Sequence, residues 1–254
     1  MILSIFGMGV LTVLVAAAPS LLLLFYFYLR DRFDREPLTH LLAAFFLGMF
    51  AMMAASGAAN AVAGWVSEEW LRTGGEAARL FDAAVLAGLV EELAKWVILI
   101  AACYHWREFD EPLDGLVYGV ALSLGFATLE NFLYVSRMGL GIAWQRAVFA
   151  VPAHALFGGT MGYYTGRAKF ERASSGRWPA RVLSLALPVF FHGAYDYALA
   201  HRLDWMVWTA VTALSLGFWI FVLRRVYRAQ RASPYRPKTM PPTMLSDPRF
   251  NRRK

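Results

Sequence analysis

Two adjacent carboxylates and a lysine interrupt one apolar run of this chain. Glu91, Glu92 and Lys95 lie in the run from Ala83 to Tyr104, which is long enough to cross a bilayer, because about 20 helical residues span the ~30 Å hydrocarbon core. An ionised side chain at the centre of such a helix costs about 2.5–3.5 kcal/mol even on lenient scales, so these groups normally face a protein interior and mark function. The spacing lets Lys95 neutralise one glutamate, which leaves the other free for acid–base chemistry.

Three further apolar segments carry polar groups in their interiors. Glu130 and Asn131 lie in the segment 113–137, His154 in 146–166, and His192 with Asp196 in 180–200. His192 and Asp196 are four residues apart, so the carboxylate can orient the imidazole or join it as a metal ligand.

These groups are predicted to lie at one depth. If successive helices alternate in direction, each acidic or imidazole group falls about seven to nine residues from the same end, or ~10–14 Å below one surface at roughly 1.5 Å per residue. The set is therefore interpreted as one catalytic site inside the bundle. Its eight candidate residues are Glu91, Glu92, Lys95, Glu130, Asn131, His154, His192 and Asp196. Gly158, Gly159 and Gly162 are expected to allow close helix approach instead.

The elements that carry these residues are predicted to be membrane-spanning helices. The 254 residues are 58% hydrophobic and only 17% charged, far from the roughly 25% charged residues of soluble domains. Period-2 strands of a barrel are absent, so an all-α, polytopic bundle is expected. Seven segments are long enough to span a membrane: 8–30, 38–64, 83–104, 113–137, 146–166, 180–200 and 204–225.

Lysine and arginine counts predict the orientation of the bundle. One set of loops and the C-terminal tail carry 19 of these residues, and the other set carries five. The positive-inside rule then puts the N-terminus outside and the C-terminus in the cytoplasm of a multi-pass inner-membrane protein. The five on the outer side are Arg72, Arg79, Arg137, Arg146 and Arg202.

The chain is expected to form one catalytic domain over residues 1–226, with its core at 83–200, followed by a basic, disordered tail at 227–254. Ten of the 25 basic residues lie between Arg224 and Lys254, where they suit a cytoplasmic membrane anchor, so the net charge of +7 needs no nucleic-acid partner.

The order of motifs resembles one known family. Glu-Glu-x-x-Lys at 91–95, Phe-x-x-x-Glu-Asn at 126–131, a histidine at 154 and His-x-x-x-Asp at 192–196 resemble the PrsW family of intramembrane proteases, which is similar to the wider CPBP group of type II CAAX prenyl endopeptidases. The resemblance implies a membrane-embedded peptidase that makes the first cut in a single-span anti-sigma factor on the extracytoplasmic side. It also implies that Glu91 and Glu92 are essential and that Glu130, His154 and His192 complete the active site.

Two mechanisms are compatible with these side chains. In one, His154, His192 and a carboxylate, for which Glu130 is the candidate, hold Zn²⁺ and a glutamate of the pair acts as general base. In the other, Glu91 or Glu92 activates water directly, and a histidine or Asn131 stabilises the oxyanion.

The predicted function is hydrolysis of a peptide bond in or near a single-span membrane protein. A proton- or ion-coupled transporter is the first alternative, but the inner half of the helices is nearly bare of charge, with Asp114 at an interface. A non-catalytic membrane scaffold is the second alternative. A prenylated peptide as substrate would be cut toward the cytoplasm, on the opposite side from the inferred site.

Overall fold

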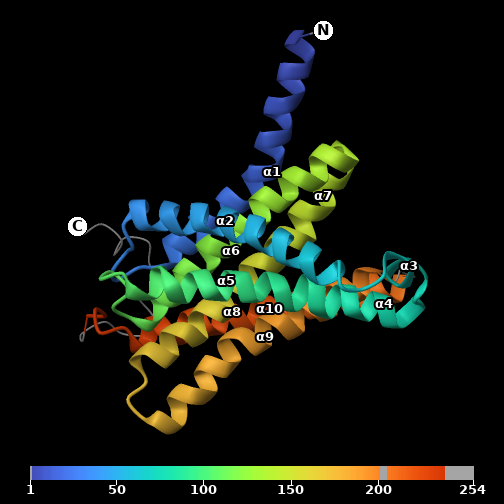
Figure 1. Ribbon diagram of the computed structural model, residues 1–254. Helices are drawn as coiled ribbons and strands as arrows, with labels where there is room; N and C mark the ends of the chain where they lie inside the picture. Colours follow the sequence, from blue (N-terminus) through green and yellow to red (C-terminus); the bar gives the residue numbers. More distant parts are fainter. Residues whose placement is uncertain (1, 201–204, 238–254) are drawn as a thin grey trace.

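A computed structural model describes residues 2–200 and 205–237, and over these residues the chain is helical with no strand (Figure 1). The predicted all-α class is therefore confirmed. The long helices are α1 (Ile2–Arg30), α2 (Leu38–Ala63), α5 (Val90–Ala101), α6 (Pro112–Met138), α8 (Val151–Phe170), α9 (Ser174–Ala200) and α10 (Trp205–Ala232). The shorter ones are α3 (Glu68–Thr73), α4 (Gly75–Phe81) and α7 (Ala143–Gln145).

Two π-helical segments lead into helices of the predicted site. η1 (Asp82–Leu89) runs directly into α5, and η4 (Arg146–Ala150) runs directly into α8. Two 3₁₀ turns, η2 (Cys103–His105) and η3 (Leu140–Ile142), complete the described elements. π-Helical turns are rare and occur frequently at functional sites, so their place before both helices is a first structural sign of function.

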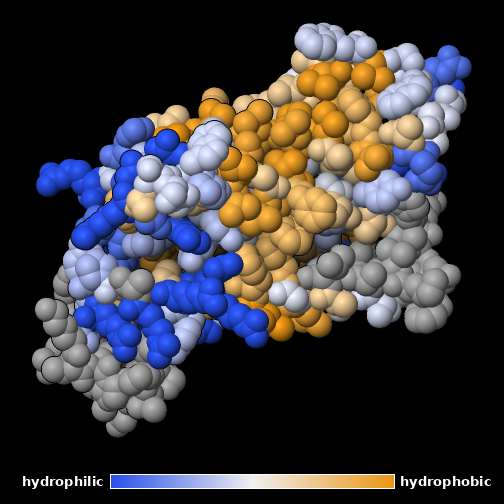
Figure 2. All heavy atoms as spheres, turned by 90° about the horizontal axis from the view of Figure 1, so that it is seen from below, coloured by the Kyte–Doolittle hydropathy of each residue, from blue (hydrophilic) through white to orange (hydrophobic). Residues whose placement is uncertain are grey.

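Four of the described helices are long and apolar enough to cross a membrane. They are Gly9–Arg30, Leu38–Ala63, Pro112–Met138 and Ser174–Ala200. The face seen from below carries a wide apolar area with hydrophilic side chains gathered toward its two ends (Figure 2). Exposed side chains such as Phe46 (62%) and Phe190 (65%) suit contact with lipid. The protein is thus a membrane protein, while the total of seven spans and their orientation stay predictions.

Helix α6 lies at the centre of the bundle and packs against α8 through glycines. A Cβ atom on Gly119 would lie 2.3 Å from the carbonyl oxygen of Gly158, and one on Gly162 would lie 1.8 Å from that of Gly115. No side chain fits at such distances, so the two backbones are in direct contact. This confirms that Gly158 and Gly162 serve close helix approach, and it fixes Glu130 on α6 relative to His154 on α8.

Helix α9 is positioned by η1. Its Gly193 packs on the backbone of Ala84 in η1, with a would-be Cβ 3.1 Å from the Cα atom of Ala84. In this way His192 is brought next to the first turn of α5. The N-terminal half of α9 swings away from α5 (Figure 1).

A second group of buried carboxylates lies at the other end of the bundle, around the loop between α1 and α2. This acidic group consists of Asp31, Glu36, Glu111 and Asp114, all at most 4% exposed. The backbone N–H of Glu36 donates to Asp31 (3.1 Å), that of Glu111 donates to Asp114 (2.6 Å), and the Tyr118 hydroxyl donates to Glu36. Of these four residues, the sequence singles out only Asp114, which it places at a membrane interface.

The C-terminal helix continues further than the sequence indicated. α10 reaches Ala232, six residues past the predicted end of the domain at 226. The remainder of the predicted tail, from 238 to 254, lies outside the described residues.

Candidate active site

Helix α5 places a fully buried ion pair at the centre of the site. Lys95 Nζ lies 2.7 Å from Glu92 Oε1 and 3.7 Å from Glu91 Oε2, and it also lies over the Phe126 ring at 3.8 Å. Glu92 and Lys95 are both 0% exposed. The i,i+3 and i,i+4 spacing expected from the sequence therefore brings both glutamates to the lysine.

His192 on α9 is held by carboxylates from two helices. Its Nδ1 lies 2.8 Å from Glu92 Oε1, and its Nε2 lies 3.9 Å from Glu91 Oε2 and 3.4 Å from Asp196 Oδ2. The Phe157 ring stacks on the imidazole with a centroid distance of 5.0 Å. The predicted pair of His192 and Asp196 is thus formed, and the imidazole is held at both ring nitrogens by carboxylates.

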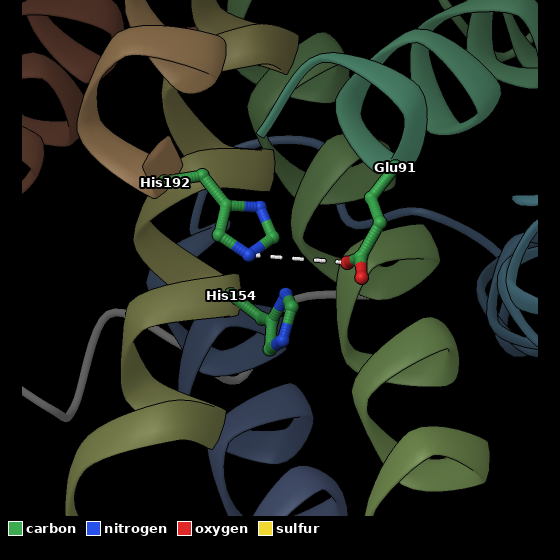
Figure 3. Close-up of side chains that lie close together, drawn as sticks. All are labelled: Glu91, His154 and His192. Carbon is green, nitrogen blue, oxygen red and sulfur yellow. Dashed lines mark ion pairs between the residues drawn. The ribbon is translucent and has the colours of Figure 1, made fainter. Parts of the chain in front are cut away.

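His154 on α8 lies between the glutamate pair and α6. Its Nδ1 is 3.2 Å from Lys95 Nζ, and its Nε2 is 2.9 Å from Glu130 Oε2. The rings of His154 and His192 have centroids 5.2 Å apart, and both face the space in front of Glu91 (Figure 3).

An arginine outside the eight predicted residues completes the site. Arg146, the first residue of η4, donates from Nη2 to Glu130 Oε2 (2.6 Å) and from Nε to Asn131 Oδ1 (2.5 Å). Its guanidinium also lies over the Tyr134 ring at 4.0 Å. Arg146 had been counted among the positive charges of an outer loop; its position just before the His154 helix was the available signal.

The eight candidate residues and Arg146 form one connected set of contacts from four helices and η4. The buried members are Glu92, Lys95, Asn131, His154 and His192. The accessible carboxylates are Glu91, Glu130 and Asp196, with side chains 20%, 13% and 32% exposed. These three side chains are therefore partly exposed, while the other members of the set are enclosed by the bundle.

One group of three side chains could hold a metal ion. Glu91, His154 and His192 each offer a ligand atom, and these atoms all lie within 4.8 Å of one another (Figure 3). Glu91 Oε2 is buried without a hydrogen-bond partner, and Glu92 holds Nδ1 of His192 while Nε2 faces Glu91. Two imidazoles and a carboxylate, with a second carboxylate orienting a ligand histidine, are the donors of a catalytic zinc site. The residues thus fit a metal.

The sequence predicts Glu130 as the carboxylate ligand beside the two histidines. In the structure, Glu130 pairs with Arg146 and His154, and within the described residues Glu91 takes the place beside both histidines.

An apolar helical bundle that encloses partly exposed carboxylates beside two buried imidazoles is compatible with a membrane-embedded hydrolase. The chain belongs to the PrsW family of intramembrane metalloproteases, which matches residues 36–225, and the protein is therefore an intramembrane protease.

Relatives of known name agree with this membership. The chain is 38% identical over 216 residues to the protease PrsW of Bacillus subtilis, a match that covers 84% of this chain and 93% of the relative. It is 37% identical over 225 residues to the protease PrsW of Geobacillus kaustophilus, covering 89% and 94%, and 35% identical over 198 residues to that of Clostridioides difficile, covering 76% and 81%. No solved structure matches the chain.

Proposed function

We infer that this protein hydrolyses a peptide bond in or next to a membrane-spanning substrate, with Glu91 at the reacting centre. The observation that carries this inference is the accessible Glu91 carboxylate, whose buried Oε2 has no hydrogen-bond partner, within 4.8 Å of ligand atoms on His154 and His192. A carboxylate beside two imidazoles in a bundle that excludes bulk water is suited to activating one water molecule for attack on an amide.

In the metal-dependent form, Glu91, His154 and His192 hold the ion, for which Zn²⁺ is the candidate. A bound zinc would lower the pKa of its water and polarise the scissile carbonyl. Glu92 keeps His192 in the tautomer that presents Nε2, and Glu130 is the accessible carboxylate that remains near His154 to accept a proton. Lys95 neutralises the buried Glu92 and so keeps the site from carrying excess negative charge.

One observation favours a metal-free form. Both ring nitrogens of His154 already have partners, Lys95 at 3.2 Å and Glu130 at 2.9 Å, so binding an ion requires one contact to break. In this form Glu91 is itself the general base, and His154 or His192 donates to the oxyanion of the tetrahedral intermediate.

The proposed side of cleavage is supported by charge, and the proposed substrate is supported by the family resemblance. The lengths of the apolar segments support seven spans, and the 19-to-5 distribution of basic residues supports an active site in the extracytoplasmic half of the inner membrane. The resemblance described above supports a single-span anti-sigma factor as substrate, cut at the first site. The other partner is the lipid bilayer.

Cleavage by purified protein tests these assignments. Wild type and Glu91→Gln are incubated with a panel of single-span peptides, with and without a strong chelator, and bound metal is measured in both. Wild-type cleavage that Glu91→Gln lacks, while the exposed-residue control Glu69→Gln retains it, supports the peptidase; full activity of Glu91→Gln contradicts it. Stoichiometric metal that is lost in Glu91→Gln, with chelator-sensitive cleavage, selects the metal-dependent form. Chelator-resistant cleavage without metal selects the other form.

A further inference from the structure

A groove of about 740 Å³ opens between α5 and α9. One wall is a stripe along α9, formed by Trp178, Val182, Ala186 and Val189. The other wall includes Leu89, the last residue of η1, and Trp96 and Ile100 of α5. The indole N–H of Trp96 donates at 2.8 Å to the hydroxyl of Ser184, which is 1% exposed, so α5 and α9 are joined at the buried base of the groove. The lining is mostly apolar and forms where the N-terminal half of α9 diverges from α5 (Figure 1).

Both walls of the groove lead to the active site. On α9 the stripe continues from Val189 to His192 within one helical turn. On the other wall, Leu89 at the end of η1 directly precedes the first turn of α5, which carries Glu91 and Glu92. The opposite end of the groove is marked by Trp178, Arg181 and His105, residue types that suit a membrane interface. The groove therefore connects one face of the bundle to the catalytic residues along the direction of the helices.

We propose that this groove binds the transmembrane helix of the substrate and delivers its scissile bond to Glu91. The proposal rests on the proposed function and names the surface that selects a membrane-spanning substrate. From Trp178 to Val189 the α9 wall is about 16 Å long at roughly 1.5 Å per residue, which is about half of the ~30 Å hydrocarbon core. Half of the substrate helix lies in the groove, and the bond to be cut comes next, where the helix meets the carboxylates.

The chemistry of the walls favours a helix over a lipid chain. Thr165, Ala168, Ser184 and Ala186 are small residues of the lining, and small residues let helix backbones approach closely in a membrane. An acyl chain with its headgroup at Arg181 would place its terminal methyl group beside Glu91 and His192. A peptide helix places amide groups beside Glu91 and His192, and hydrolysis of an amide is the reaction proposed for these residues.

Filling the groove tests the proposal. Ala186→Trp, in the exposed part of the α9 wall, is compared with Leu42→Trp, a lipid-facing position on α2 that is 46% exposed. The substrates are a single-span peptide from the panel that wild type cleaves and a shortened peptide with the same cut site but without the span. In Ala186→Trp the ratio of kcat/KM for the two peptides falls about tenfold or more, because the indole takes the apolar area that the docked helix would bury; in Leu42→Trp it does not change. An unchanged ratio in Ala186→Trp overturns the proposal.

Crosslinking separates this proposal from the proposed function. A photoreactive amino acid is introduced at position 182 or, as control, at position 42 of the Glu91→Gln protein, and each single-span peptide of the panel is added in lipid vesicles. Crosslinks to a peptide from position 182 and not from position 42 support the groove, even if wild type cleaves no peptide and the proposed function fails. Crosslinks from position 182 to lipid alone overturn the groove, whether or not the protein is a peptidase.

Discussion

Exposure divides the carboxylates of the active site into two kinds. Glu92 is 0% exposed and its Oε1 contacts both Lys95 and His192, so it acts by positioning other groups. Each glutamate has one oxygen without a hydrogen-bond partner, but only the Glu91 side chain is exposed, at 20%, so Glu91 is the member of the pair proposed to meet water and substrate. Neighbouring residues of the same type thus take different roles because of their surroundings.

Arg146 positions Glu130 and, through it, His154. Replacing Arg146 by Ala is expected to lower kcat about 10- to 100-fold, the usual range for partners that orient active-site groups. Arg146→Lys should recover part of the loss, because it keeps the charge but not both hydrogen bonds. Steady-state cleavage kinetics check this, with Arg137→Ala, an exposed arginine at the end of α6, as control; a kcat equal to wild type in Arg146→Ala contradicts the role.

The acidic group makes stability depend on pH. Burial raises the pKa of the Asp31 carboxyl to about 8 and also raises the pKa of Glu36, whereas an aspartate in the unfolded chain ionises near pH ~4. Between these values the folded state holds the extra proton, so stability falls as the pH rises from about 4 to about 8.

Asp31→Asn removes that ionisation and should flatten the pH dependence. The thermal unfolding midpoint of the detergent-solubilised protein, measured from pH 5 to 9, should fall less with pH in Asp31→Asn than in wild type. The exposed acid Glu69 provides the control as Glu69→Gln, which should follow the wild-type curve. A parallel decline in Asp31→Asn and wild type would show that Asp31 does not carry the effect.

Much of the site could be predicted residue by residue because charge in a lipid environment is conspicuous. Glu91, Glu130, His154 and His192 stand out against apolar neighbours, and equal depth along alternating helices was enough to predict that they meet. Arg146 could not be assigned in this way, because a basic residue at a helix end is ordinary at a membrane interface. Arg146 is also the first residue of the π-helical segment η4, and composition does not encode π-helical winding.

At the scale of helices, the contact between α6 and α8 depends on the absence of side chains. Gly162→Ala would place a methyl group 1.8 Å from the carbonyl oxygen of Gly115, so the helices must separate. Overpacking of this kind costs about 1–3 kcal/mol, and cleavage activity should fall as well because Glu130 and His154 lie on the two helices.

Gly57→Ala is the matched control, since a Cβ at Gly57 of α2 meets nothing within 4 Å. Unfolding midpoints of both variants in the same detergent check the prediction. It fails if the Gly162 variant is as stable as the Gly57 variant.

The helices themselves follow from the apolar runs, but their interruptions do not. Each of the seven predicted segments contains a helix in the structure, because in lipid every backbone group must be paired within its own helix. The segment from 83 to 104 is divided into η1, α5 and η2, and a periodicity of apolar residues does not distinguish π-helical from α-helical turns. The burial of Asp31 and Glu36 could not be predicted either, because both residues lie in a short loop, where charged side chains are normally solvated.

At the scale of the whole molecule, the two sets of loops lie toward opposite ends of the bundle. The loops at 31–37 and 102–111 lie at the left of Figure 1, and α3 and α4 lie at the right. This arrangement is the one that alternating membrane crossings require. It does not depend on which end faces the cytoplasm.

Labelling of single cysteines tests the predicted orientation. In a Cys103→Ser background, a cysteine at position 69 in α3 is expected to react with an impermeant thiol reagent on intact cells, whereas one at position 172, between α8 and α9, reacts only after permeabilisation. The reverse pattern would place the active site in the cytoplasmic half and contradict the orientation inferred from the basic residues.

The π-helical segment η1 determines how α5 is rotated about its own axis. Each residue turns an α-helix by about 100°, and a π-helical turn holds more residues than an α-helical one, so η1 sets the angle at which α5 presents its side chains. If the same eight residues formed an α-helix while α4 stayed fixed, α5 would rotate about its axis. The side chain of Glu91 would then no longer point toward His192. The direction in which Glu91 points thus depends on how the eight residues of η1 are wound.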